Sequence, residues 1–140
     1  MSSIGKNLAK IHSLQRSYLK PILDPYHVPA NSFSIILNIG RNEGISQKQL
    51  CEVINMDEGL VARLVKKLEE QEIIYKKRNT NDLRAYQLFL TEIGKELYPQ
   101  ISLKLQKWWD RLLLDLPQDL LNEYIITMTQ RAVELLKEDN

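Results

Sequence analysis

Residues 46–71 read SQKQLCEVINMDEGLVARLVKKLEEQ, and this stretch decides the fold. Ser46, with Gln49 three residues later, is a capping-box pattern that satisfies the first backbone N–H groups of a helix. We therefore expect a short helix over residues 47–54. Asn55 follows it and tolerates a left-handed backbone better than most residues do, which indicates a turn.

A longer helix follows this turn. Asp57 is a suitable N-cap, because its carboxylate can accept a hydrogen bond from an N–H of the first turn, so we expect a helix over residues 58–71. The apolar residues of this helix recur at helical spacing and form one stripe: Leu60, Val61, Leu64, Val65 and Leu68. A short helix, a turn and a longer helix together predict a helix-turn-helix over residues 46–71.

Two segments with strand composition come next. Residues 73–78 (IIYKKR) and 85–90 (AYQLFL) contain the β-branched and aromatic residues that strands favour. The polar residues 79–84 between them predict a loop longer than a tight turn, so we expect a β-hairpin over residues 73–91. A helix-turn-helix followed directly by a two-stranded hairpin is a winged helix, in which the hairpin is the wing.

Further helices are expected before this winged helix. Apolar residues at helical spacing predict a helix over residues 4–19, which Pro21 and Pro25 would end. A second helix is expected over residues 29–42, and Gly44 can take the left-handed conformation that ends it.

Two long helices are expected after the wing. Thr91 is a suitable cap for a helix over residues 92–115, and Pro117 would start a last helix that runs to about residue 137. In the last helix a seam of apolar residues steps by 4, 3, 4 and 3 residues, as in a coiled coil: Leu121, Ile125, Met128, Ala132 and Leu135. The expected fold class is mostly α (α+β), a winged helix-turn-helix with additional N- and C-terminal helices.

Composition and motif content exclude several protein classes. No apolar run approaches the ~20 residues that a membrane-spanning helix needs, and the first residues lack the apolar core of a secretory signal. No metal-ligand spacing, nucleophile motif or phosphate-binding glycine loop is present. We expect a cytoplasmic protein that is not an enzyme and has no metal or cofactor. We expect the single cysteine, Cys51, to be a small buried apolar group rather than a redox sensor.

Positive charge is concentrated in the longer helix of the helix-turn-helix and in the wing. Arg63, Lys66 and Lys67 share one helix face. Between residues 75 and 91, four basic residues stand against one acidic residue, which gives a local net charge of +3: Lys76, Lys77, Arg78 and Arg84 against Asp82. A basic helix beside a basic hairpin matches the electrostatic footprint of duplex DNA. The alternative is an ordinary solvated helix face beside a structural turn.

The segment 55–94 resembles the MarR-type regulators, the multiple-antibiotic-resistance repressors. Four elements of the family pattern occur in order: Arg63 in the recognition helix, Leu68-Glu69 near its end, Asp82-Leu83-Arg84 in the wing and Leu90-Thr91-Glu92-Ile93-Gly94 after it. The resemblance implies a homodimeric transcriptional regulator, most simply a repressor, that binds a pseudo-palindromic site in double-stranded DNA.

The resemblance also implies a division of the chain and roles for single residues. Residues 29–94 would form the winged helix, and residues 1–28 and 95–140 the dimerisation region. Asp82 would hold the wing turn in place. The expected DNA-binding residues are Ser46, Gln47, Glu58, Gly59, Ala62, Arg63, Lys66, Lys67, Lys76, Lys77, Arg78, Asn81 and Arg84.

Family members often bind small aromatic anions in a cleft between the dimer helices and the winged helix. A small aromatic or anionic effector is therefore a further expected partner. The residues expected to line its cleft are Tyr18, Tyr26, His27, Phe33 and Arg41. The alternative for the tyrosines is ordinary packing at helix ends.

The chain departs from the family pattern at four positions: Glu58, Leu60, Glu72 and Leu83. Glu58 repels phosphate, although its carboxylate can accept a hydrogen bond from cytosine. Leu60 lacks a hydroxyl that is common there, and Glu72 replaces the usual glycine. These departures leave open an alternative function, a winged-helix protein-interaction module that does not bind an operator.

Overall fold

The computed structural model describes residues 3–82 and 85–139. Arg84, which is expected at the wing tip, and its neighbour Leu83 lie outside the described residues. The chain divides into two compact units, residues 1–105 and 106–140.

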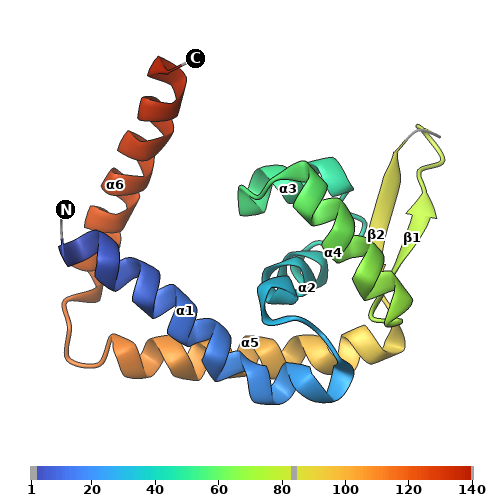
Figure 1. Ribbon diagram of the computed structural model, residues 1–140, viewed down its shortest axis with the longest axis horizontal. Coiled ribbons are helices and arrows are strands. Elements are labelled where there is room, and N and C mark those ends of the chain that lie inside the picture. The colour runs from blue at the N-terminus through green and yellow to red at the C-terminus, as the bar shows by residue number, and fades with distance from the viewer. Residues whose placement is uncertain (1–2, 83–84, 140) are drawn as a thin grey trace. The chain divides into compact units, whose positions relative to one another are not determined.

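The first unit contains the helix-turn-helix and the hairpin (Figure 1). Its elements are α1 (Ser3–Leu23), α2 (Phe33–Arg41), α3 (Gln47–Ile54), α4 (Glu58–Glu70), β1 (Ile74–Arg78), β2 (Tyr86–Leu90) and the first part of α5 (Glu92–Leu112). Two short 3₁₀ helices, Asp24–Tyr26 and Ala30–Ser32, join α1 to α2. The predicted mostly α fold with a two-stranded hairpin is confirmed.

The first helix is longer than the sequence predicts. We expected it to end before Pro21, but α1 continues through Pro21 to Leu23. A proline inside a helix removes one backbone hydrogen bond and costs about 3 kcal/mol. The compensating gain is burial, because Leu19 and Leu23 lie one turn apart and are both fully buried.

The second and fifth helices are shorter than the sequence predicts. We expected the second helix to begin near residue 29, but Pro29 is extended (φ −63°, ψ 141°) and α2 begins only at Phe33, after the 3₁₀ turn. The fifth helix ends at Leu112 rather than near residue 115. Gly44 has a φ of 94°, so the left-handed position expected after α2 is confirmed.

The helix-turn-helix begins and turns where its sequence signals predict. The Gln49 N–H donates to Ser46 Oγ at 3.1 Å, and the Ser46 N–H donates to Gln49 Oε1 at 3.0 Å, which completes the capping box of α3. Asn55 takes the left-handed conformation with φ 48°. The Leu60 N–H donates to Asp57 Oδ2 at 3.1 Å, so Asp57 caps α4.

The hairpin has a regular antiparallel register, from the pair Ile74↔Leu90 at its base to the pair Arg78↔Tyr86 near its loop. Side chains alternate between the two faces, so Ile74, Leu88 and Leu90 are buried on one face. On the other face the rings of Tyr75 and Phe89 stack with their centroids 5.3 Å apart.

A third extended segment, which the sequence does not reveal, pairs with the outer edge of β2. The Gly44 N–H donates to the Leu88 carbonyl at 2.8 Å, and the Leu88 N–H donates to the Ile45 carbonyl at 2.9 Å. Glu43 extends this contact, because its Oε1 accepts a hydrogen bond from the Leu90 N–H at 3.0 Å. These bonds attach the start of α3 directly to the wing.

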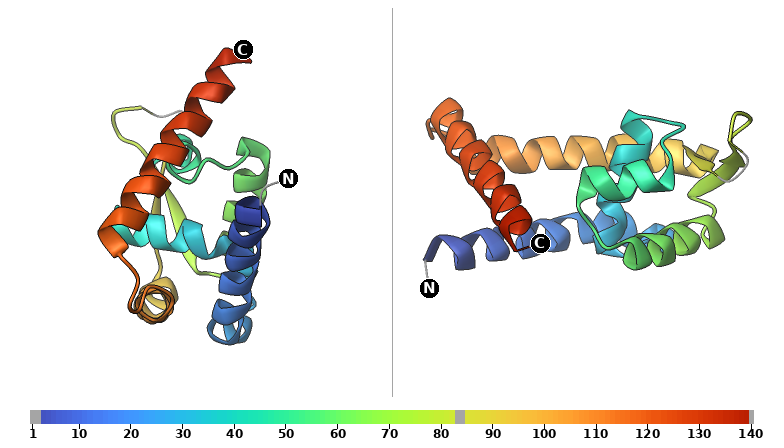
Figure 2. Two further views of the ribbon diagram at one scale, coloured as in Figure 1. Left: turned by 90° about the vertical axis from the view of Figure 1, so that its left-hand side faces the viewer. Right: turned by 90° about the horizontal axis from the view of Figure 1, so that it is seen from above.

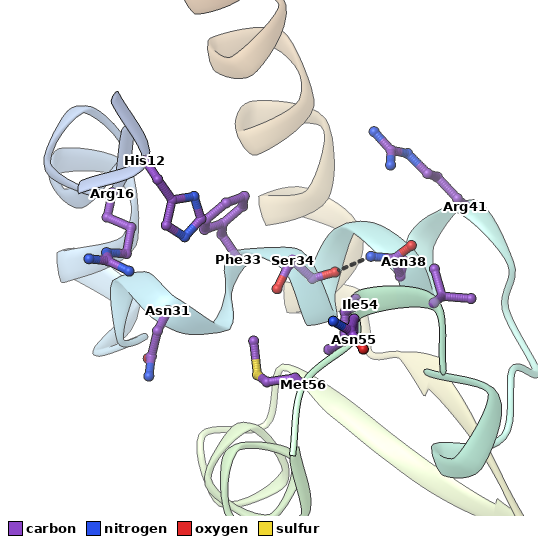
Figure 3. A pocket seen from close by; sticks show the side chains of 11 residues that line it. His12, Arg16, Asn31, Phe33, Ser34, Asn38, Arg41, Ile54, Asn55 and Met56 are labelled. Carbon is purple, nitrogen blue, oxygen red and sulfur yellow. Dashed lines mark hydrogen bonds between the residues drawn. The ribbon is translucent and has the colours of Figure 1, made fainter. Parts of the chain in front are cut away.

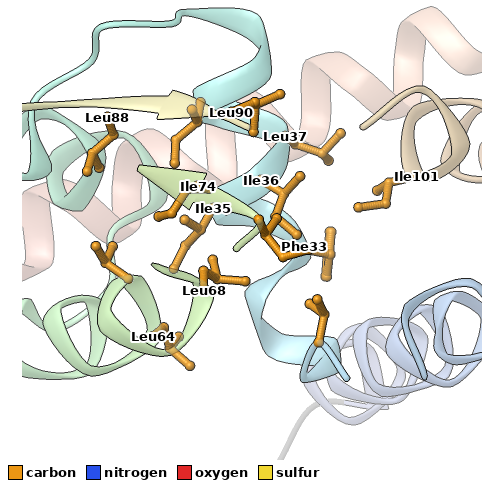
Figure 4. Close-up of a cluster of buried hydrophobic side chains, with 14 of the residues drawn as sticks. Phe33, Ile35, Ile36, Leu37, Leu64, Leu68, Ile74, Leu88, Leu90 and Ile101 are labelled. Atoms are coloured by element: carbon orange, nitrogen blue, oxygen red, sulfur yellow. The ribbon is translucent and has the colours of Figure 1, made fainter. Parts of the chain in front are cut away.

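One apolar core joins the elements of the first unit (Figure 4). α2 lies at its centre, since Ile35, Ile36 and Ile39 are all fully buried. The core also takes fully buried side chains from α3, α4, β2 and α5: Leu50, Val61, Val65, Leu68, Leu88, Leu97 and Ile101. Burial of one such side chain contributes about 1.5–3 kcal/mol, so this shared core fixes α4 relative to the hairpin.

The start of α5 packs closely on the base of the hairpin. The Thr91 hydroxyl accepts a hydrogen bond from the Gly94 N–H at 3.1 Å, so Thr91 caps α5 as predicted. A Cβ at Gly94 would collide with the Ile73 carbonyl oxygen. The Leu-Thr-x-x-Gly sequence therefore joins helix and sheet, and its glycine permits the close approach.

The second unit consists of the end of α5 and of α6 (Gln118–Glu138). α6 is one unbroken helix (Figure 2), and none of its residues is buried. The seam residues Ile125, Met128 and Leu135 are 44%, 42% and 61% exposed. The seam predicted from the sequence is therefore present as an exposed apolar surface.

Candidate nucleic-acid interface

α4 has one buried face and one cationic face. Val61, Leu64, Val65 and Leu68 are buried against the core. The 3.6-residue period then places the basic residues on the opposite side, where Arg63, Lys66 and Lys67 are all exposed. None of these three makes an ion pair within residues 3–82 and 85–139. Their charge is therefore available to a polyanion.

The tip of this face is the first turn of α4. Glu58, Gly59 and Ala62 are exposed there. The Asp57 carboxylate is occupied as the N-cap, whereas the Glu58 carboxylate has no ion-pair partner in the part of the chain that the structure describes. The exposed residues near Glu58 on this turn, Gly59 and Ala62, are small and carry no side-chain acceptor.

Two cations of the wing, Lys76 and Arg78, in contrast contact neighbouring side chains. Lys76 Nζ lies 3.3 Å from Glu69 Oε1 on α4, so this ion pair joins the wing to the recognition helix. Arg78 donates from Nη2 to the Tyr86 hydroxyl at 2.9 Å. Lys77 is exposed and alternates with them onto the other face of the strand.

The described part of the wing loop is held by local hydrogen bonds. The Asn79 N–H donates to the Ala85 carbonyl and the Ala85 N–H donates to the Asp82 carbonyl, both at 3.0 Å. The Asn79 side chain accepts from the Asn81 N–H at 2.9 Å. Asp82 therefore takes part in the hydrogen bonds of this loop through its carbonyl, while its expected partner Arg84 lies outside the described residues.

Ser46 and Gln47 lie at the start of α3, half-buried, and line a groove that faces the wing. The Ser46 oxygen already accepts the capping bond, but its hydroxyl proton is a remaining donor. Lys48, Lys76 and Tyr86 line the same groove, which has a volume of about 520 Å³. Lys48 and Tyr86 were not predicted as site residues, because their proximity to Ser46 and Gln47 depends on the fold.

Comparison with known protein families matches residues 28–86 to the MarR family. The HTH-type transcriptional regulator SarZ of Staphylococcus epidermidis is 30% identical over 117 residues, which cover 82% of this chain and 71% of SarZ. The chain belongs to the MarR family.

Solved MarR structures share its fold. A MarR transcriptional regulator from Methanosarcina mazei Go1 has a TM-score of 0.81 at 26% identity, over 94% of this chain and 97% of that chain. A protein from Listeria monocytogenes, described as a MarR family transcriptional regulator and solved with 26mer DNA, has a TM-score of 0.76 at 27% identity, over 99% of this chain and 89% of that chain. The predicted family and winged-helix fold are confirmed. Because the family consists of transcriptional regulators, the prediction that the protein is not an enzyme is also confirmed.

This MarR protein has an open groove of about 610 Å³ between α1, α2 and the end of α3 (Figure 3). Phe33 and Arg41, two of the five residues expected to line an effector cleft, line this groove. His12 and Arg16 of α1 also line it, and they lie four residues apart on one helix face. That spacing was the only sign in the sequence that the two residues belong together.

The other three expected cleft residues lie elsewhere in this MarR chain. The Lys104 ammonium lies 4.7 Å from the centre of the Tyr18 ring. The Tyr26 hydroxyl accepts a hydrogen bond from Gln100 Nε2 at 3.3 Å. His27 takes a left-handed backbone, with φ 57°, and lines a different groove. The packing alternative therefore describes the two tyrosines better than the cleft hypothesis does.

Cys51, on α3, is buried in the core, as expected for a small apolar group. Burial raises the pKa of its thiol, and the negative charge of Glu58 raises this pKa further. The thiol is consequently protonated and weakly nucleophilic at neutral pH.

The described residues of this MarR chain include no helix long and apolar enough to cross a membrane. Within the same residues, no three acidic, histidine or cysteine side chains gather in a group that could hold a metal ion.

Proposed function

We propose that this MarR protein is a homodimeric repressor that binds a specific, pseudo-palindromic site in double-stranded DNA in the cytoplasm. The observation that carries the proposal is the cationic face of α4, because Arg63, Lys66 and Lys67 are exposed and unpaired within the described residues. Three unpaired cations on one helix face are a suitable surface for phosphates, whose contacts supply most of the affinity of such proteins.

Sequence selection is assigned to the first turns of α4, which the helix-turn-helix presents to a major groove. Gly59 and Ala62 would allow the helix backbone to approach base edges, and Arg63 would pair with a guanine. Glu58 would accept a hydrogen bond from the amino group of cytosine. Ser46, Gln47 and Lys48 at the start of α3 would contact phosphates.

The wing would contact the adjacent DNA. Lys77, Arg78 and Asn81 are exposed on it, and Lys76 is partly committed to Glu69. Arg84 would enter a minor groove, where the negative potential is concentrated. The wing would thus add affinity, and α4 would add sequence selection.

The dimer is proposed from the second unit. α6 carries an apolar seam over about two heptads and buries none of its own residues. A second copy with the same seam is the simplest partner, because a two-fold axis pairs identical surfaces. In this proposal residues 1–28 and 95–140 form the dimerisation region, and residues 29–94 form the DNA-binding head.

An effector would bind in the groove lined by Phe33 and Arg41. His12 and Arg16 add donors and positive charge beside the Phe33 ring, a combination suited to a small aromatic anion. Because the groove touches both α1 and the winged helix, a bound anion would change the separation of the two recognition helices and so weaken DNA binding.

The test is selection of bound fragments from random duplex DNA with the purified protein. A two-fold symmetric consensus with half-sites about one helical turn apart is expected. At the base pair nearest the tip of α4, the fragments selected by the wild-type protein are expected to carry cytosine. The fragments selected by the Glu58→Gln variant are expected to show no preference for cytosine there. The proposal would be refuted if no consensus sequence were recovered and if the affinity for DNA did not depend on salt concentration.

A second candidate function, a winged-helix protein-interaction module, is favoured by one observation. Glu58, which makes no ion pair with any described residue, lies at the tip of α4, where it repels phosphate. The two functions differ in salt dependence, since only duplex DNA binding releases many condensed counterions.

A further inference from the structure

Tyr86 contacts two of the wing cations at once. It lies directly across the hairpin from Arg78, as its antiparallel pair. Arg78 Nη2 donates to the Tyr86 hydroxyl at 2.9 Å, and the guanidinium carbon lies 5.3 Å from the centre of the ring. On the same face, Lys76 Nζ lies 5.5 Å from the ring centre. Both distances are within the range of cation–π attraction.

We propose that Tyr86 is a positioning residue for DNA binding, which holds the Arg78 guanidinium in a fixed direction toward a backbone phosphate. This proposal rests on the DNA-binding function proposed above. Arg78 lies on the same strand face as Lys76, and Lys76 and Tyr86 line the groove opposite the start of α3. Arg78 does not line this groove, but a phosphodiester strand that leaves the groove along this face of the wing would meet it.

The contacts with Tyr86 orient the Arg78 guanidinium group but do not neutralise its charge. Tyr86 accepts one of the five guanidinium N–H groups, so the remaining donors and the full positive charge are available to phosphate oxygens. Lys76 differs, because its ammonium also pairs with Glu69 at 3.3 Å. Of these two cations, Arg78 is therefore the better one for a phosphate.

Fixing the direction of Arg78 has a thermodynamic reason. A free arginine side chain loses rotamer entropy when it binds, and a side chain that is already ordered loses less. The hairpin register provides this order, because it places Tyr86 and Arg78 opposite each other in every folded molecule. The effect of the Tyr86 hydroxyl on DNA binding should consequently pass through Arg78, the cation that donates to it.

The experiment compares Tyr86→Phe and Tyr86→Leu with wild type, using a fluorescently labelled mixed-sequence duplex at several salt concentrations. Tyr86→Phe is expected to weaken binding about threefold, since it removes only the hydrogen bond. Tyr86→Leu is expected to weaken it about tenfold, since it also removes the ring. The matched control is Tyr75→Phe, because Tyr75 lies on the opposite face of β1, is similarly exposed (47% against 40% for Tyr86), and should leave affinity unchanged.

A structural role of Tyr86 is separated by repeating the substitution in the Arg78→Ala protein. In that protein Tyr86→Phe is expected to have no further effect on DNA affinity. With Arg78 intact, Tyr86→Leu should reduce the salt slope of DNA binding by about 0.9, the value of one lost phosphate contact. Equal weakening in the presence and absence of Arg78, or wild-type affinity in Tyr86→Leu, would overturn the positioning role. If the wild-type protein shows no salt-dependent binding to the duplex, the proposed function fails as well. Urea unfolding checks that the variants fold. If Tyr86→Leu does not fold, the comparison of Tyr86→Phe in the presence and absence of Arg78 remains as the test.

Discussion

α4 and α6 are both surface helices, but they offer surfaces of opposite character. α4 buries four apolar side chains in its own core and exposes Arg63, Lys66 and Lys67. α6 buries nothing and exposes apolar residues such as Ile125 and Met128. Exposure of a cationic face to water is favourable, whereas an extended apolar face exposed to water usually marks an interaction site. The comparison indicates two different partners, a polyanion for α4 and another apolar surface for α6.

The largest expected effect comes from breaking the seam of α6. The double substitution Ile125→Asp with Met128→Asp places two carboxylates in the apolar surface and should make the protein monomeric in sedimentation. The affinity for a symmetric DNA site should then fall about a hundredfold or more, because the two heads no longer bind as one molecule. The control is Asn122→Asp with Gln130→Asp, which adds the same charge away from the seam and should leave a dimer. A double variant that still sediments as a dimer would disprove the role of α6.

The next largest effect is expected on the cationic face of α4. Arg63→Ala should cost about 1–3 kcal/mol of DNA-binding free energy, as for an arginine that contacts a base, with no change in the unfolding midpoint. Glu70→Ala, two turns later on the same exposed face, is the control and should not weaken binding. The measurement is fluorescence anisotropy at one fixed salt concentration, and retained affinity in Arg63→Ala would count against α4 as the recognition helix.

The dependence on salt concentration should further distinguish the cationic face of α4 from the apolar seam of α6. The logarithm of the DNA-binding constant should fall linearly with the logarithm of salt concentration. Dimerisation through an apolar seam should not weaken as salt is added. Lys66→Ala should reduce the DNA salt slope by about 0.9, the value of one phosphate contact. Lys76→Ala should reduce it less, because Lys76 is already paired with Glu69. Equal slopes in the two variants would mean that the ion pair opens when DNA binds.

The smallest expected effect concerns Glu72, which follows the C-cap residue of α4. Glu72 has a φ of 59°, a conformation that costs a residue with a side chain and suits glycine. Glu72→Gly should therefore raise the free energy of unfolding by about 1 kcal/mol. Glu70→Gly, at the last residue of α4, should lower it, by no more than the about 1 kcal/mol that glycine costs inside a helix. Urea denaturation measures both, and destabilisation by Glu72→Gly would show that the Glu72 side chain makes a compensating contact.

Local chemistry explains why much of this fold could be predicted. The capping box at Ser46, the N-cap at Asp57 and the left-handed Asn55 each depend on residues within a few positions of one another. The hairpin likewise follows from alternation along two neighbouring segments. Such signals survive in a single sequence because the interacting groups are close along the chain.

The features that could not be predicted depend on contacts between distant segments. The continuation of α1 through Pro21 requires the buried site that receives Leu23. The strand-like pairing of Gly44 with Leu88 joins residues more than forty positions apart. The groove beside Phe33 depends on α1 lying next to α2, and for the same reason the sequence could not show which of the five expected residues line it.

The exposed seam of α6 also has a genetic consequence. If identical seams bring two chains together, a chain with Arg63→Ala and an intact α6 would pair with wild-type chains and give each mixed dimer only one competent head. Such an allele would interfere with the normal copy in the same cell, whereas an allele that also lost the seam would be recessive.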